Sequence, residues 1–296
     1  MSFINVDSYY EMEDGTKVYV CIHPDGSLKL VPHNDLVKAI ESTKEGLINA
    51  AVINGKIERS SGEKIERRDF TVFKAGDNLI DKYSMTVEQN VFVAKRNIVD
   101  YIWKSAKLEG IAVTYPDTEA IYNGLIISGM HVDDIQAINN LKYAWRFILE
   151  TVNYPTNYPL ICKINQYVGS NLFPNSGLIR TVPVSIGGTN WKPDLPIEAQ
   201  IKEELGEVLK LQGKTDKAIT IMLYLMRKQM FLDGNKRTAM LTGNHVMVTN
   251  GVGIISVPIE VQVRFTELLV QYYESNDMKE IKQFVYDYCI DGIALE

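Results

Sequence analysis

Cysteine is scarce in this sequence, which has only Cys21, Cys162 and Cys289 among 296 residues. They are far apart and lack the paired, close spacing of a metal knuckle, so we expect no zinc site. Three scattered thiols do not make a disulfide framework and are typical of the reducing cytoplasm. The sequence therefore predicts a cytoplasmic protein without structural metal or disulfides.

Long apolar runs and an excess of positive charge are also missing. No run approaches the ~18 apolar residues of a membrane span, and residues 1–7 have neither the basic nor the apolar region of an export signal. The net charge is -6, so no global field attracts nucleic acid or an anionic membrane. We expect neither as a partner, and any bound anion must be held by a local group of residues.

Residues 1–85 have a mixed pattern of short strands and turns. Residues 17–22 and 28–31 flank a turn and predict a β-hairpin. A helix is expected from Asn34, followed by a second, polar hairpin around residues 60–63. We therefore predict an α+β appendage over residues 1–85.

Residues 86–296 have a helical hydrophobic period. The expected helices cover residues 91–108, 117–127, 132–152, 159–172, 196–211, 216–230, 235–249, 258–274 and 278–289. One interruption, at residues 177–191, is β-branched and then turn-like, which predicts a short hairpin or flap. The predicted fold class is mainly α, a helical domain with a β-hairpin flap and a small appendage.

A glycine turn directly precedes the expected helix that begins at Asn235. Backbone N–H groups at a helix start have no partner within the helix, and the helix dipole adds about half a positive charge there. Gly234 permits close approach of an anion, while Lys236 and Arg237 add two cations. Asp233 is a hard oxygen ligand suited to magnesium. The same pattern also fits an ordinary helix–turn–helix corner with solvated charges, so both interpretations stay open.

The stretch resembles the signature of the Fic family, His-Pro-Phe-x-(Asp or Glu)-Gly-Asn-Gly-Arg-x-x-Arg. The matching residues are Phe231, Asp233, Gly234, Asn235 and Arg237. The resemblance implies transfer of a phosphate-containing group, usually AMP from ATP, onto a protein hydroxyl. It implies that Asp233 holds Mg²⁺. The residues expected to bind the phosphates are Gly234, Asn235, Lys236 and Arg237.

Two other segments resemble parts of that family. Residues 105–110 match its inhibitory-helix motif, (Ser or Thr)-x-x-x-Glu-(Gly or Asn), with Ser105, Glu109 and Gly110 at the defined positions. Residues 177–188 lie where such proteins carry a flap that grips a target by strand addition. The flap residues expected to contact the target are Thr181, Val182, Val184 and Ile186.

Gln229 occupies the position of the family's catalytic histidine. Its neutral amide cannot accept a proton at a useful pH, and a positioned base contributes about 10²- to 10⁴-fold. His245 lies on the order of 15 Å along the helix and is a poor substitute. His131 is expected at the surface or as a helix cap, and Glu109 is the acid that the resemblance brings near. We therefore expect impaired base catalysis.

Two substitutions resemble the Doc branch of the family, which transfers a terminal phosphoryl group. Lys236 replaces the glycine before the first arginine, and Met240 replaces the second arginine. A lysine here obstructs the usual seat of the β and γ phosphates. Glu109 normally pairs with the second arginine, so we expect it either to pair with Lys236 or Arg237 or to have lost its role.

Residues outside the motif have simpler interpretations. Tyr272 and Tyr273 recur at helical spacing and are expected in the core. Trp191 is expected to anchor the flap by packing, and Arg180 to form a structural salt bridge.

Two functions stay open at this point. The first is a transferase of AMP or phosphate from ATP to a protein hydroxyl, with Mg²⁺ and with impaired base catalysis. The second is an inactive nucleotide-binding protein that acts through its interactions. The expected partners are a nucleotide and a protein target held by the flap, and association into a homodimer is left open. A DNA-binding regulator has little support because of the acidic charge.

Overall fold

The structure, a computed structural model, describes residues 79–294 and the backbone of six strands between residues 3 and 66. The chain divides into two compact units, Met1–Val72 and Phe73–Glu296. The two units are described separately below.

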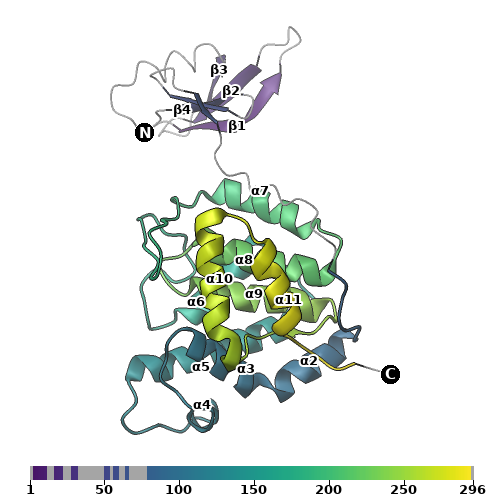
Figure 1. The fold of residues 1–296 in the computed structure, drawn as a ribbon. Coiled ribbons are helices and arrows are strands. Elements are labelled where there is room, and N and C mark those ends of the chain that lie inside the picture. Colours follow the sequence, from purple (N-terminus) through teal and green to yellow (C-terminus); the bar gives the residue numbers. More distant parts are fainter. Residues whose placement is uncertain are drawn as a thin grey trace. The chain divides into compact units, whose positions relative to one another are not determined.

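The N-terminal unit contains two three-stranded antiparallel sheets (Figure 1). Their strands are β1 Phe3–Glu11, β2 Lys17–Ile22, β3 Leu28–Pro32, β4 Ala50–Ile53, β5 Lys56–Arg59 and β6 Lys64–Glu66. The predicted hairpins correspond to β2–β3, in which Ile22 pairs with Leu28, and to β5–β6. Strands β1 and β4 were not predicted, and the helix expected from Asn34 lies outside the described residues.

The second unit is mainly helical, as predicted (Figure 1). Its first five helices are α2 Val87–Arg96, α3 Ile98–Leu108, α4 Tyr115–Tyr122, α5 Val132–Glu150 and α6 Tyr158–Val168. The next five are α7 Glu198–Leu209, α8 Lys214–Lys228, α9 Asn235–Thr249, α10 Gln262–Ser275 and α11 Lys279–Tyr288. A short 3-10 helix, η1 Ile259–Val261, precedes α10, and β7 Ile254–Ile255 pairs with β8 Ile290–Asp291. None of the helices in the described part of the chain is long and apolar enough to cross a membrane.

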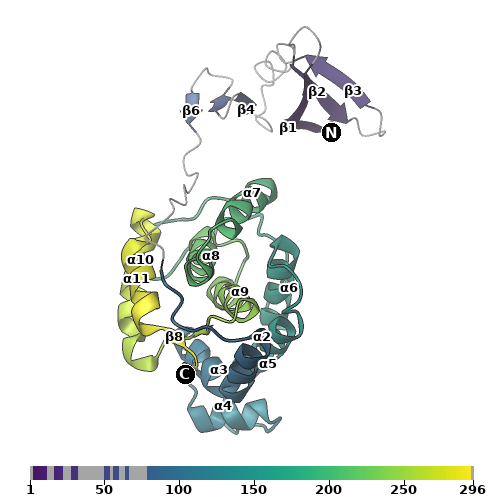
Figure 2. The same ribbon diagram turned by 90° about the vertical axis from the view of Figure 1, so that its right-hand side faces the viewer.

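Helix α9 runs through the centre of this unit, with α5, α6 and α8 around it (Figure 2). Residues 237–248 are all buried, as expected for a helix that contacts neighbours on every side. Met247 belongs to the core shared with α8 and α10, whereas Leu241 belongs to the core shared with α3, α5 and α6. The N-terminus of α9 is thereby fixed between two hydrophobic clusters.

The helix predicted at residues 91–108 is in fact two helices separated at Asn97. The Asn97 side chain donates to the Tyr101 hydroxyl and to Asp291, each at 3.3 Å. Asp291 is remote in sequence, so no local pattern indicates this break.

The predicted β-hairpin at residues 177–191 does not form a strand ladder. The segment is a loop with a turn at Gly187 and Gly188, and Ile179, Ile186 and Trp191 pack against the helical core. β-Branched residues favour strands only where a partner strand is available. Here the flap is held by side-chain contacts to the helices.

Residues 79–85, which the sequence assigned to the appendage, contact the helical unit. The Asp81 carboxylate accepts hydrogen bonds from the Thr215 backbone N–H at 2.9 Å and hydroxyl at 2.7 Å. The Met85 N–H donates to Gly251 at 2.8 Å. The division at Val72 and Phe73 therefore precedes the expected boundary after residue 85.

Candidate functional site

The turn between α8 and α9 is built around a left-handed glycine. Gly234 has φ 73°, and a Cβ added there would lie 2.8 Å from Val168 Cγ1. A side chain would thus be disfavoured by backbone conformation and by lack of space. The first N–H groups of α9 have no acceptor within the helix, and no side chain of residue 234 caps them.

Asn235 fixes the shape of this turn. Its Oδ1 accepts from the Phe231 N–H at 2.9 Å, and its Nδ2 donates to the Phe231 carbonyl at 2.8 Å. The Phe231 side chain is buried and anchors the turn in the core. The side chain of Asn235 is therefore engaged with protein backbone, and its backbone N–H is the group at the helix start.

Asn165 supports the turn from α6 and was not identified from the sequence. Its Nδ2 donates to the Asp233 carbonyl and to Thr238 Oγ1, both at 3.0 Å. Its Oδ1 accepts from the Gly177 N–H at 2.8 Å. This fully buried amide joins the base of the flap to the turn and to α9. The only indication in the sequence is that this asparagine lies among the apolar positions of the helix expected at residues 159–172.

Arg180 binds backbone carbonyls, not the carboxylate partner that the sequence suggested. Its Nε donates to the Gln229 carbonyl at 2.7 Å, and its guanidinium also donates to Val182, Pro193 and Asp194 carbonyls. Burial lowers the pKa of the Arg180 guanidinium, although the nearby Asp194 charge opposes this shift. The predicted salt bridge was wrong in its partners, but the structural role is confirmed.

Lys236, Arg237 and Glu109 form a charged cluster at the start of α9. Glu109, which follows α3, lies 3.6 Å from Lys236 Nζ and 3.8 Å from Arg237 Nε. Arg237 Nη2 is also 3.4 Å from Asp233 Oδ1. The sequence had suggested these two cations as partners of Glu109. Gly110 follows with φ 82°, a conformation in which the chain leaves α3.

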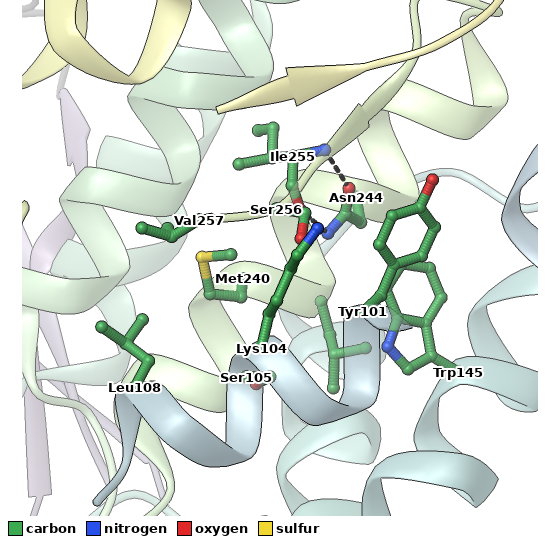
Figure 3. A pocket seen from close by; sticks show the side chains of 11 residues that line it. Tyr101, Lys104, Ser105, Leu108, Trp145, Met240, Asn244, Ile255, Ser256 and Val257 are labelled. Atoms are coloured by element: carbon green, nitrogen blue, oxygen red, sulfur yellow. Dashed lines mark hydrogen bonds between the residues drawn. The ribbon is translucent and has the colours of Figure 1, made fainter. Parts of the chain in front are cut away.

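Met240 lies on the side of α9 that faces α3 (Figure 3). It lines a small cavity together with Ser105 and Leu108 of α3 and Ser256 (Figure 3). The cavity provides about 20 Å³ for water-sized groups, which is room for about one water molecule. The position that the family signature gives to a second arginine is thus occupied by an apolar side chain, which lines the cavity between α9 and α3.

Gln229 adopts a left-handed conformation with φ 47° at the end of α8. Its Nε2 donates to the Met226 carbonyl at 2.6 Å, and the residue is only 8% exposed. The amide is therefore folded back onto the end of its own helix. Burial at this position leaves little room for a flexible side chain.

The other candidate bases lie elsewhere. His245 is fully buried, with Nδ1 2.7 Å from Thr156 Oγ1 and Nε2 3.1 Å from the Thr151 carbonyl. Burial lowers the pKa of its imidazole. His131 is exposed at the start of α5 and makes no side-chain capping bond. Neither residue is brought to the α9 turn.

The aromatic residues of α10 are in the core, as expected. Tyr272 and Tyr273 are each 2% exposed. Trp191 of the flap stacks on Tyr273 with ring centroids 5.7 Å apart, and Arg227 lies over the Trp191 ring at 4.5 Å. The prediction that Trp191 anchors the flap by packing is confirmed.

Asp233 is the acid best placed to hold a metal ion. Its side chain is 63% exposed, and its Oδ1 accepts from the Gly234 N–H. No group of three or more His, Cys, Asp or Glu side chains suited to a metal occurs among residues 79–294. Mg²⁺ commonly uses one or two carboxylates together with substrate phosphates and water, so a single carboxylate at the α9 turn fits that ion.

Helices α8 and α9 form a central buried pair, joined by a glycine turn with an acid before it and two cations after it. Residues 155–247 match the model of the Fic/DOC family. This part of the helical unit is therefore similar to the Fic/DOC family.

Similar proteins come from animals and bacteria. The chain is 25% identical over 175 residues to "Protein adenylyltransferase fic-1" of Caenorhabditis briggsae, covering 56% of this chain and 34% of that protein. It thus spans about a third of that relative. The solved structure of C. elegans Fic-1 (aa134–508) has a TM-score of 0.58 at 22% identity, covering 67% of this chain and 62% of that one. A Fic domain containing signaling protein from Bacteroides thetaiotaomicron has a TM-score of 0.57 at 16% identity, covering 68% of this chain and 84% of that one. These likenesses establish the fold.

Proposed function

We propose that this protein binds ATP with Mg²⁺ at the α9 turn and transfers AMP or phosphate to a protein hydroxyl, at a rate limited by the missing base. The observation that carries the proposal is the α9 N-terminus itself. There the left-handed Gly234 precedes unpaired helix N–H groups, with Lys236 and Arg237 in the first turn. Such a helix start favours phosphate through its N–H groups and its dipole.

Each residue of the turn has a role in this proposal. Arg237 supplies a nearly buried cation whose Nε has no hydrogen-bond partner among the residues that the structure describes, and so it is suited to a phosphoryl oxygen. Asp233 would hold Mg²⁺, which supplies charge neutralisation when bound. Phosphoryl transfer depends mainly on positioning and charge, so an intact turn retains part of the catalytic function. The Lys236 ammonium points towards α3, where its Nζ lies 3.4 Å from the Leu108 carbonyl. Its position beside the phosphates would influence whether the α or the γ phosphorus of ATP is attacked.

A second candidate function, an inactive nucleotide-binding regulator, is favoured by the Gln229 side chain. Its amide is bonded to Met226 and offers no proton acceptor of useful basicity. Incubation of the purified protein with lysate and with α- or γ-labelled ATP separates the candidates. Label from α-ATP on protein means nucleotidyl transfer, label from γ-ATP alone means phosphorylation, and no label favours the regulator.

The proposal includes the target, the assembly and the location. We propose that flap residues Thr181, Val182, Val184 and Ile186 hold the target by strand addition, because Thr181 and Val182 are exposed and no described strand pairs with them. A cytoplasmic location follows from the sequence features above. Homodimer formation stays a prediction.

Arg237→Ala should weaken binding of Mg-ATP or Mg-ADP by a few kcal/mol, because charge-assisted hydrogen bonds to the phosphates are lost. Isothermal titration calorimetry measures the change. Arg264→Ala is the matched control, since Arg264 is an exposed arginine paired with Glu267 and Glu280 on the surface. Equal affinity in wild type and Arg237→Ala would reject the α9 turn as the nucleotide site.

Glu109→Gly and Glu109→Gln should tighten nucleotide binding by roughly fivefold to tenfold, about 1 kcal/mol. Both remove a partly buried carboxylate that competes with phosphate for Lys236 and Arg237. The control is Glu207→Gln, which removes an exposed carboxylate paired with Lys210. Unchanged affinity would mean that the match of residues 105–110 to an inhibitory motif is accidental.

A further inference from the structure

Gln229 has a backbone conformation that glutamine rarely adopts. Its φ is 47° and its ψ is 58°, in the left-handed region. Among residues 79–294, the other residues with positive φ that are not glycine are all asparagines, Asn171, Asn175 and Asn276. Asparagine tolerates this region because its short side chain bonds locally to the backbone. A left-handed glutamine persists only where its surroundings hold it, so the groups around Gln229 have to account for its conformation.

One residue of the flap holds the two carbonyl groups that follow this point. The Gln229 N–H donates to the Leu225 carbonyl at 3.3 Å, which fixes the preceding peptide unit as part of α8. The Arg180 Nε donates to the Gln229 carbonyl at 2.7 Å, and the Arg180 N–H donates to the Met230 carbonyl at 2.9 Å. Because ψ sets the direction of a residue's own carbonyl, the bond from Arg180 Nε fixes ψ of Gln229.

The Arg180 guanidinium is held by further bonds of its own. Arg180 is 2% exposed, and its Nη1 and Nη2 donate to the carbonyls of Val182, Pro193 and Asp194. The guanidinium is planar and its donors have fixed directions, so bonds near both ends of the flap keep Nε in place. The Gln229 carbonyl is therefore bonded to a rigid donor.

The conformation of residue 229 matters because the family signature has its catalytic histidine at this position. In the present conformation the Gln229 amide reaches the Met226 carbonyl, to which Nε2 donates at 2.6 Å. A change in ψ would rotate the side chain of residue 229 relative to the turn at residues 230–234. The side chain would then also move relative to the proposed phosphate site.

We infer that Arg180 is a positioning residue for position 229. Its guanidinium holds the Gln229 carbonyl, fixes the left-handed conformation of this residue, and so sets where the side chain at the base position lies. The inference rests on the proposed function, which gives that position its role. The same guanidinium bonds carbonyls between residues 182 and 194, so a target that moves the flap would also move the side chain at position 229.

Hydrogen exchange of the Gln229 side-chain amide tests the inference without requiring activity. In protein labelled with ¹⁵N-glutamine, NMR follows the exchange at each Nε2. Arg180→Met should accelerate exchange at Gln229 by roughly tenfold, the factor expected when one hydrogen bond that holds the segment is lost. The exposed Gln212 amide should exchange at the same rate in both proteins. Should methionine prevent folding, Arg180→Lys keeps the charge without the planar fork and should accelerate exchange at Gln229 in the same way.

Asn244→Ala is the matched control for a general loss of stability. The buried Asn244 amide accepts from the Ile255 N–H at 2.7 Å and donates to the Ile255 carbonyl at 2.8 Å, so alanine also leaves buried backbone groups unpaired. It should lower the midpoint of urea unfolding but leave exchange at Gln229 within about twofold of wild type. Equal exchange at Gln229 in wild type and Arg180→Met would overturn the inference. Equal acceleration in Arg180→Met and Asn244→Ala would also overturn it, since the effect would then be global.

Activity provides a second measurement, in a Gln229→His variant that restores a base at this position. Adding Arg180→Lys should lower kcat by about 10²-fold, the cost of misplacing a reacting group by ~1 Å, and leave KM for ATP unchanged. A change in KM alone would assign Arg180 to nucleotide binding and overturn its positioning role. Absence of transfer by Gln229→His would count against the proposed function, and the exchange measurement would still decide the role of Arg180.

Discussion

Gln229→His should raise transfer of label from ATP to protein by about 10²- to 10⁴-fold, the usual contribution of a positioned base. The backbone is suited to the change, because residue 229 has φ 47° and histidine adopts this left-handed region more readily than most residues. The expected result is strong labelling by the variant under conditions in which wild type labels weakly. Single-turnover measurement with α- and γ-labelled ATP gives the rate and the group transferred.

Gln229→Asn is the control for Gln229→His, since asparagine also accepts the left-handed conformation but provides no base. Its rate should stay near that of wild type. If histidine alone has no effect, Lys236→Gly with Met240→Arg should be needed as well to recover AMP transfer. A wild type already as fast as Gln229→His would identify a phosphotransferase that works without a base at this position, and would overturn the proposed limitation.

Arg180→Met should lower the free energy of unfolding by about 2–4 kcal/mol, because it leaves buried carbonyls without donors. The carbonyls belong to Gln229, Val182, Pro193 and Asp194, on three separate segments. Methionine preserves much of the apolar stem, so the loss reports the guanidinium. Urea unfolding followed by circular dichroism measures it.

Limited proteolysis provides a second measurement on Arg180→Met, because cleavage within residues 183–192 should accelerate once this clamp is lost. Arg180→Lys should fall between wild type and methionine, since one ammonium cannot reach all of these carbonyls. The control Arg264→Met removes an exposed arginine and should change stability by no more than about 0.5 kcal/mol. A loss below 1 kcal/mol for Arg180→Met would show that the flap is held mainly by Ile186 and Trp191.

The sequence predicts most helices well because their hydrophobic faces recur with a regular period. Helix α9 begins and ends where expected, at residues 235 and 249, because a glycine turn precedes it and Asn250 and Gly251 follow it. The break at Asn97 and the missing ladder of the flap have tertiary causes. Asn97 contacts Asp291, and such distant contacts leave no mark in a local window.

The candidate site is predictable in its residues but less so in its geometry. The signature placed Asp233 and Arg237 on one turn, and Arg237 Nη2 lies 3.4 Å from Asp233 Oδ1 there. The side-chain direction of Gln229 depends on one backbone torsion and on the Met226 carbonyl, which residue spacing does not encode. Asn165 is not part of the signature. A single polar residue within an apolar helix indicates that its side chain is buried, but the sequence does not show which groups it bonds.

The position of Asn165 has a thermodynamic consequence for any two ligands of this domain. The amide oxygen of Asn165 holds Gly177 at the base of the flap, and its amide nitrogen holds Asp233 and Thr238 at the start of α9. On the proposed function, a target that displaces the flap would act on the bond to Gly177, and a nucleotide at the turn would act on the bonds to Asp233 and Thr238, which belong to the same amide. Their binding free energies would then be coupled, and linkage would make the coupling reciprocal: whatever factor the nucleotide applies to target affinity, the target would apply to nucleotide affinity.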